Sequence, residues 1–272
     1  MCNQGGKLLL AALEQHGDNY RKRLKKCHKY CHEPAVHKVR TAARRLLSVV
    51  DLLRSIRPKA RLGKLRQHIK AQLDAFDELR DTQVMLLETA RQVSTLPTLL
   101  PFQHYLQRRE QLLLVDCRAF IHQQSAGALR RKLKKARRRC RRQLQDCDPH
   151  HEQNRVIDNL NASVLDRLQA VNPLDLASIH HLRIAVKKLR YTLSATGDLL
   201  PEYPPLHYDL LLKHLELMGN IQNSEVLTAA LEKFYVQGVP LDVQYFFQQQ
   251  QTDLLDAFSN LEPLTLPEIR NL

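Results

Sequence analysis

One motif occurs twice in this chain, about half a chain apart, and it constrains the fold more than any other feature. Residues 36–48 read VHKVRTAARRLLS, and residues 179–191 read IHHLRIAVKKLRY. Aligned without gaps, the copies agree in histidine, basic and apolar positions: His37/His180, Arg40/Arg183, Ala42/Ala185, Arg44/Lys187, Arg45/Lys188 and Leu46/Leu189. Such a duplication predicts two similar structural units, each with a similar basic surface.

A second pair of segments repeats at nearly the same offset. Residues 78–87 read ELRDTQVMLL, and residues 220–229 read NIQNSEVLTA. The aligned pairs are Leu79/Ile221, Asp81/Asn223 and Val84/Val226. Two matches at one spacing indicate internal repetition. We therefore expect two halves, residues 1–148 and 149–272, divided at Asp148-Pro149.

Helix-breaking residues are sparse, and Leu, Arg, Lys and Gln are frequent, which favours an all-α chain. Proline and glycine still punctuate it. The patterns predict helices over about 19–31, 34–55, 61–94 with an interruption near 73–76, 102–145 with a break at Gly127, 152–171, 174–199, 205–236 and 241–260. This gives roughly four helices in each half, the number that closes a four-helix bundle.

The charge balance points to anionic partners. Lys and Arg number 42 against 28 Asp and Glu, which leaves a net charge of +14 and a pI near 9.7. That balance predicts attraction to nucleic acid, anionic lipid or polyphosphate. The apolar run 8–13 is too short to span a bilayer, so we expect a cytoplasmic protein. The six cysteines are compatible with reduced thiols.

Each motif segment is amphipathic at helical spacing. In the second copy one stripe opposes an apolar face and contains His180, Arg183, Lys187, Arg190 and Tyr191. In the first copy the stripe contains His37, Arg40, Arg44 and Ser48. A solvated basic face is the simpler interpretation. Against it, both stripes include uncharged hydrogen-bonding groups, they recur in one register, and few acidic residues stand near them; Asp51 and Asp198 lie near the far ends.

A denser basic segment lies between the two repeated parts of the chain. Residues 130–142 read RRKLKKARRRCRR, with ten Lys or Arg in thirteen positions. Two cation rows flank an apolar stripe: Arg130, Lys134, Arg137 and Arg141, and Arg131, Lys135, Arg138 and Arg142. The retained periodicity favours a folded anion-binding wall over an incidental basic run. A third basic stretch spans residues 21–29.

With these segments, the chain resembles the CHAD domain, the conserved histidine α-helical domain. The resemblance rests on VHKVRTAARRL, ELRDTQV, IHHLRIAVKKLRYTL and GNIQNSEVL, in the family's order, and it covers about residues 15–260. It implies two four-helix bundles related by pseudo-twofold symmetry and a basic groove or pore between them. It also implies inorganic polyphosphate as ligand and association with polyphosphate granules.

The resemblance implies ligand contacts within both motif copies, and we expect the dense basic segment to add more. The expected contacts are His37, Arg40, Arg44, Arg45, Arg130, Lys134, Arg137, Arg138, Arg141, His180, Arg183, Lys187, Lys188, Arg190 and Tyr191. The copies also differ. Ser48 stands where the second copy has Tyr191, and Gln222-Asn223 replaces Arg80-Asp81. We expect Asp81 to pair with a nearby cation, because a carboxylate repels phosphate.

Catalysis finds little support in the sequence. There is no glycine-rich phosphate loop, and no E-x-E-x-K strand of the triphosphate-tunnel type that often accompanies CHAD domains, so we expect a stand-alone, non-catalytic module without cofactor or metal. Cys27-His28 and Cys31-His32 could bind a metal, but incidental residues at a helix end are the better interpretation. A nucleic-acid-binding protein and a polyphosphate- or triphosphate-processing enzyme remain as alternatives.

Overall fold

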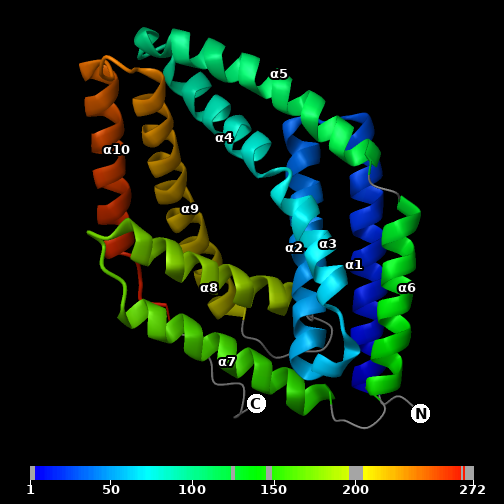
Figure 1. Cartoon of the computed structure of the whole chain (residues 1–272). Helices are drawn as coiled ribbons and strands as arrows, with labels where there is room; N and C mark the ends of the chain where they lie inside the picture. The colour runs from blue at the N-terminus through cyan, green and yellow to red at the C-terminus, as the bar shows by residue number, and fades with distance from the viewer. Residues whose placement is uncertain (1–3, 124–125, 145–148, 196–204, 265, 267–272) are drawn as a thin grey trace.

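The protein is described by a computed structural model over residues 4–123, 126–144, 149–195, 205–264 and 266. Those residues form helices and no strand, which confirms the predicted all-α class. The elements in Figure 1 are α1 (Gln4–Lys29), α2 (Glu33–Ile56), η1 (Pro58–Ala60), α3 (Gly63–Asp74), α4 (Asp77–Gln92), η2 (Pro97–Leu99), α5 (Leu100–Gln123), α6 (Ala126–Gln143), α7 (Pro149–Gln169), α8 (Leu176–Ala195), α9 (Pro205–Phe234) and α10 (Leu241–Ser259).

The first motif helix, α2, begins and ends where the sequence predicts. His32 precedes it in an extended conformation, and its Nδ1 accepts a hydrogen bond from the Ala35 amide at 3.2 Å. Pro34 lies in the first turn, where its missing N–H is not needed. The helix ends at Ile56, just before Pro58. The second motif helix, α8, begins at Leu176 and is described as far as Ala195, and residues 196–199 of its predicted range lie outside the described residues.

The predicted interruption near 73–76 is confirmed, because α3 ends at Asp74 and α4 begins at Asp77, with the Phe76 ring buried between them. One boundary is wrong. The first helix begins at Gln4 and not near Asn19, since Leu9 and Leu13 are buried and continue its apolar face. The predicted break at Gly127 falls slightly earlier, because α6 begins at Ala126.

Two apolar clusters hold the helices that carry the motifs. The first joins α1, α2, α3 and α6 through side chains such as Leu13, Leu46 and Ile69, all nearly inaccessible to solvent. The second joins α7, α8, α9 and the end of α10 through side chains such as Ile157 and Leu189. Each motif helix therefore buries its apolar face in a different cluster.

A third cluster combines helices from both halves of the sequence. Met85 and Phe102 from α4 and α5 pack with Leu227 and Phe247 from α9 and α10. In Figure 1, α4 and the start of α5 meet α9 and α10 at the end of the molecule away from α6, and α5 then runs back towards α1. The division into one bundle per half stays a prediction, and its boundary at Asp148 lies outside the described residues.

The third cluster predicts a difference between two apolar side chains of α5. Phe102 is fully buried, whereas Leu112 is 68% exposed. Phe102→Ala should lower the free energy of unfolding by about 3–5 kcal/mol, because it leaves a cavity where the halves meet. Leu112→Ala should change it by less than about 0.5 kcal/mol. Urea unfolding followed by circular dichroism measures both; equal effects would contradict this assignment of the core.

Candidate anion-binding site

Helices α2 and α8 pack against each other, so the two motif copies meet at one place (Figure 1). Their cations are close enough to affect one another. Burial, together with the charges of Arg44, Arg183, Arg40 and Arg190, lowers the pKa of Lys187 to about 7. We call these five side chains the α2–α8 cation cluster: Arg40, Arg44, Arg183, Lys187 and Arg190.

Arg40 differs from its predicted place in an open cation row, because its side chain is buried and 5% exposed. It forms an ion pair with Asp77 at the start of α4 and donates a hydrogen bond to the Leu73 carbonyl at 3.1 Å. Burial lowers the pKa of Arg40, as does the charge of Arg44, while Asp77 opposes the change. The ion pair with Arg40 is made by Asp77. Asp81, expected to pair with a nearby cation, lies near several: burial raises its pKa, and the charges of Arg40, Arg80 and Arg44 oppose this.

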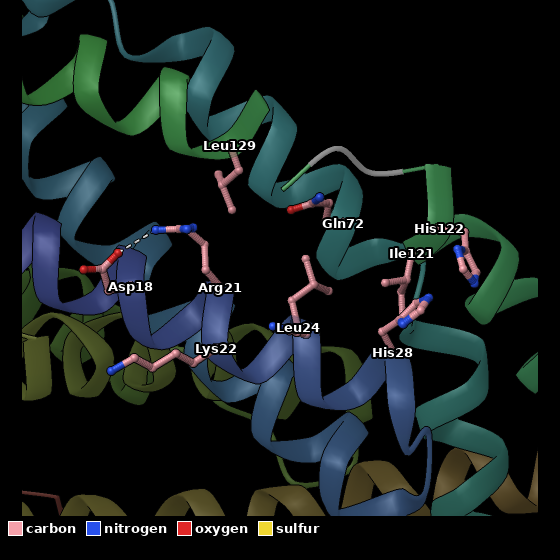
Figure 2. Close-up of a pocket in the computed structure, with 10 residues that line it drawn as sticks. Asp18, Arg21, Lys22, Leu24, His28, Gln72, Ile121, His122 and Leu129 are labelled. Carbon is pink, nitrogen blue, oxygen red and sulfur yellow. Dashed lines mark hydrogen bonds and ion pairs between the residues drawn. The ribbon is translucent and has the colours of Figure 1, made fainter. Parts of the chain in front are cut away.

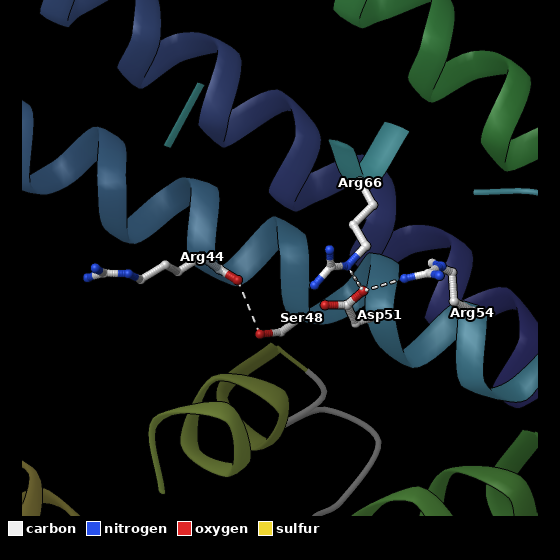
Figure 3. Close-up of polar contacts among 5 residues, drawn as sticks. All are labelled: Arg44, Ser48, Asp51, Arg54 and Arg66. Atoms are coloured by element: carbon white, nitrogen blue, oxygen red, sulfur yellow. Dashed lines mark hydrogen bonds and ion pairs between the residues drawn. The ribbon is translucent and has the colours of Figure 1, made fainter. Parts of the chain in front are cut away.

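Arg44 extends from α2 and forms no ion pair among the described residues, although its charge acts on Asp81 of α4. Figure 3 shows why Asp51, on the same helix, does not neutralise it: that carboxylate accepts from Arg66 Nε at 2.7 Å and from Arg54 Nη1 at 3.3 Å. The Ser48 hydroxyl, predicted to belong to the ligand-facing stripe, donates to the Arg44 carbonyl at 3.1 Å. The Ser48 hydroxyl proton is therefore already used in a hydrogen bond to the backbone.

The cations of α8 are less neutralised than Arg40. Over the described part of the chain, Arg183, Lys187 and Arg190 form no ion pair, and the buried Nε atoms of both arginines lack a hydrogen-bond partner. Tyr191 is 9% exposed, and the Arg190 guanidinium lies 5.2 Å from the centre of its ring. Tyr191 is therefore a largely buried side chain that packs against Arg190, and it is not an exposed member of the stripe.

The two motif histidines lie near this cluster but make different contacts. His37 stands near the Glu33–Arg80 ion pair, and partial desolvation and the charge of Arg80 lower its pKa. His180 donates from Nδ1 to the Gln222 side-chain oxygen. Gln222 in turn donates to Glu225 at 3.0 Å, which fixes the direction of its amide.

Two predicted contacts in the motif helices point elsewhere. The charge of Arg45 acts on His16 of α1, whose pKa is lowered mainly by burial. Lys188 is exposed and lines a hollow with Arg155 and Asn159 of α7. The structure therefore brings Arg44, Arg183, Lys187 and Arg190 together with the paired Arg40, and it separates Arg45 and Lys188 from them.

The dense basic segment forms a second surface, distinct from the cluster. Helix α6 packs on α1, α3 and η1, and Figure 1 shows it on the side of α1 opposite α2. Its predicted ligand contacts are all exposed: Arg130, Lys134, Arg137, Arg138 and Arg141. Of these, Arg137 pairs with Glu14 of α1 at 3.2 Å. That these α6 residues bind the ligand stays a prediction, and they would do so on a surface separate from the α2–α8 cation cluster.

A cavity of about 490 Å³ between α1, α3, α5 and α6 contains part of the third basic stretch. Figure 2 shows Arg21, Lys22 and His28 beside the apolar side chains of Leu24 and Leu129. Arg21 forms an ion pair with Asp18 at 2.9 Å, so this cavity supplies a carboxylate to its arginine, as Asp77 does to Arg40 of the α2–α8 cation cluster.

The cysteines and histidines at the end of α1 make contacts with one another. Cys27 Sγ and Cys31 Sγ lie 3.8 Å apart and are buried, and His28 packs edge-on against His122. Among the described residues, no group of three or more His, Cys, Asp or Glu side chains is arranged to hold a metal ion. In the same part of the chain, no helix is long and apolar enough to cross a membrane.

This geometry defines a class of all-helical proteins in which two basic helices lie in contact. The CHAD domain family profile matches residues 11–232, so the chain belongs to the CHAD domain family. The crystal structure of the CHAD domain from the plant Ricinus communis superposes with a TM-score of 0.71. It shares 20% sequence identity, and the match covers 96% of this chain and 94% of that one. No match was found among curated proteins.

The lowered pKa of Lys187 predicts a pH-dependent stability difference. Unfolded lysine has a pKa near 10.4, so between about pH 7 and 10 the unfolded state binds more protons, and the folded state gains stability as pH rises. Lys187→Met should therefore stabilise the ligand-free protein by at least about 1 kcal/mol at pH 7, the equivalent of roughly one pKa unit. This gain should shrink towards pH 10.

Thermal unfolding at several pH values measures the effect, and Lys188→Met is the matched control. Lys188 is the adjacent residue on the same helix but is exposed. Its replacement should leave the pH dependence unchanged. If the Lys187 and Lys188 variants behave alike, the cations do not repel one another as described.

Proposed function

We propose that this CHAD domain protein binds inorganic polyphosphate at the α2–α8 cation cluster, without catalysing a reaction. The observation that carries the proposal is the partly buried group of Arg44, Arg183, Lys187 and Arg190 at the contact of α2 and α8, none of which forms an ion pair among the described residues. Like charges held together in a partly buried site destabilise the protein until a counter-anion binds. We also propose that the chain arose by internal duplication and that each half supplies one wall of the binding site.

The chemistry of the side chains favours a phosphate chain. Arginine presents a planar fork of N–H donors that matches phosphate oxygens, and lysine adds a compact charge. A linear polyanion also carries condensed counterions, and their release into solution drives binding. The net charge of +14 would increase the rate of encounter with any such ligand.

A nucleic-acid ligand is the competing possibility, because its backbone also offers phosphates. Base stacking on aromatic side chains has little support at the cluster, since the described aromatic ring there is Tyr191 and it is largely buried. An enzymatic role on polyphosphate or triphosphate would require release of phosphate.

We propose that the protein acts in the cytoplasm, at polyphosphate granules.

The proposal predicts how two neighbouring lysines differ in binding. Lys187→Gln should weaken polyphosphate binding about tenfold, because it removes one charge-assisted contact worth roughly 1.5 kcal/mol. Lys188→Gln should change the dissociation constant less than about twofold, since an exposed charge outside the cluster contributes little. Isothermal titration calorimetry with long-chain polyphosphate at physiological salt measures both.

Competition by duplex DNA and RNA in the same titration tests the choice of ligand. We expect polyphosphate to be displaced only by a large excess of nucleic acid per charge. Equal competition would contradict the polyphosphate assignment, and phosphate release in the presence of Mg²⁺ or Mn²⁺ would contradict the non-catalytic one.

The histidines predict tighter binding at low pH. Protonation adds positive charge beside the anion, so affinity should rise as pH falls. For His37 the change should occur below pH 6.5, because its pKa is lowered by partial desolvation and by Arg80. Titrations between pH 5.5 and 8 at constant ionic strength, with the double variant His37→Ala/His180→Ala as control, measure this. A flat profile in the wild type would refute the role of the histidines.

A further inference from the structure

Another cavity, of about 610 Å³, lies between α6 and the turn that joins η1 to the start of α3, and we call it the α3–α6 cavity. Helix α6 packs on both η1 and α3, on the side of α1 opposite α2, so this cavity is separate from the α2–α8 cation cluster. Among the described residues no carboxylate lines it. The side chains that line it are mostly cationic: Arg61, Lys64, Lys132, Lys135 and Arg139, beside Leu62, Leu65 and Ala136.

Helix α6 supplies one wall of the α3–α6 cavity. Lys132, Lys135 and Arg139 follow the spacing i, i+3, i+7, which places them along one stripe of the helix. Lys132 and Arg139 are half-buried, whereas Arg131 and Arg142 of the same helix are exposed and do not line the cavity. Neither Lys132 nor Arg139 is among the ligand contacts expected from the sequence, so the structure directs attention to a different face of α6.

The opposite wall has an unusual backbone conformation at Arg61. Its φ is 53°, in the left-handed region, and within the described residues no other residue except glycine has a positive φ. Glycine or asparagine adopts this conformation with less strain, so an arginine side chain is kept here at a cost in backbone energy. The Arg61 carbonyl accepts a hydrogen bond from Arg139 Nη1 at 3.4 Å, which joins the two walls.

The positive charge of the cavity is not neutralised from within the described chain. None of its five cations forms an ion pair there, and the carboxylate that α6 meets, Glu14, pairs with Arg137 outside the cavity. The N-cap residue of α3, Leu62, makes no side-chain capping hydrogen bond, so the positive end of that helix dipole adds to the same charge. The cavity therefore concentrates positive charge in the way that anion sites do.

We propose that the α3–α6 cavity is a second anion site, which binds a short phosphate chain, either free tripolyphosphate or the triphosphate of a nucleotide. Its volume lies within the range of small-molecule sites, about 300–1,000 Å³, and exceeds what one phosphate group fills. Arginines and lysines on two facing walls can each contact a different phosphate of such a chain. This site goes beyond the proposed polyphosphate site and does not depend on it.

Isothermal titration calorimetry with tripolyphosphate at physiological salt tests the site. The cavity variant is Lys132→Gln/Arg139→Gln, and the matched control is Arg131→Gln/Arg142→Gln, which removes the same charge from exposed positions of α6. The cavity variant should bind at least about tenfold more weakly than the control, because two charge-assisted contacts are lost. Equal affinity of the two variants would overturn the proposal.

Titration with ATP and with adenosine distinguishes the two sources of a triphosphate. If ATP binds more tightly than tripolyphosphate, and the cavity variant weakens both, the ligand is a nucleotide. If ATP binds equally or more weakly, and adenosine does not bind, the ligand is the free phosphate chain. Tight binding of adenosine that the cavity variant leaves unchanged would contradict recognition through phosphate.

The substitution Arg61→Asn tests the opposite wall and separates binding from folding. Asparagine tolerates the left-handed conformation, so the melting temperature should stay the same or rise. Tripolyphosphate binding should nevertheless weaken severalfold, because one cation of the cavity is removed. Unchanged affinity in the folded Arg61→Asn protein would remove this wall from the site and overturn the proposal.

The variant Lys187→Gln separates this cavity from the α2–α8 cation cluster, where tripolyphosphate could also bind. The weakening caused by the cavity variant should be the same with and without Lys187→Gln. If Lys187→Gln abolishes tripolyphosphate binding and the cavity variant does not weaken it, the cluster is the site and the cavity is refuted. If the wild type binds long-chain polyphosphate but neither tripolyphosphate nor ATP, the cavity is refuted and the proposed function stands.

Discussion

Repulsion among cations at the contact between α2 and α8 is the constraint on which the rest of the site depends. Two apolar clusters fix the motif helices from opposite sides, and this leaves Arg44, Arg183, Lys187 and Arg190 in a partly desolvated space. Burial of apolar surface supplies the free energy that holds these charges together. The proposed anion would find these side chains already in place, so little reorganisation would accompany its binding.

The fold was largely predictable from the sequence because its signals are local. Proline at 34 and 58 and the interrupted pattern near 73–76 determine helix ends through backbone geometry, and they were predicted correctly. The third apolar cluster was not predicted. Phe102 and Phe247 lie far apart in the chain, and helical periodicity identifies which face is buried but not which helix covers it.

The candidate site was predicted in part for the same reason. The repeated motif identified all five cations that meet at the cluster, but spacing along one helix could not show that Arg40 is neutralised from α4. The signal was present one residue before a recognised segment, where Asp77 aligns with Gly219. The density of charge in α6 did not show where that helix lies, because an exposed helix carries a high charge whether or not it contributes to a shared site.

The third cluster has a consequence for the history of the fold. A chain with the first half alone would expose Met85, Phe102 and Leu106 on one face, an apolar patch that invites association. If the two halves arose by gene duplication, the single-copy ancestor could cover this face by pairing with an identical chain about a twofold axis. Fusion would then have freed the two copies to diverge, so that a glycine in one repeat occupies the position of an aspartate in the other.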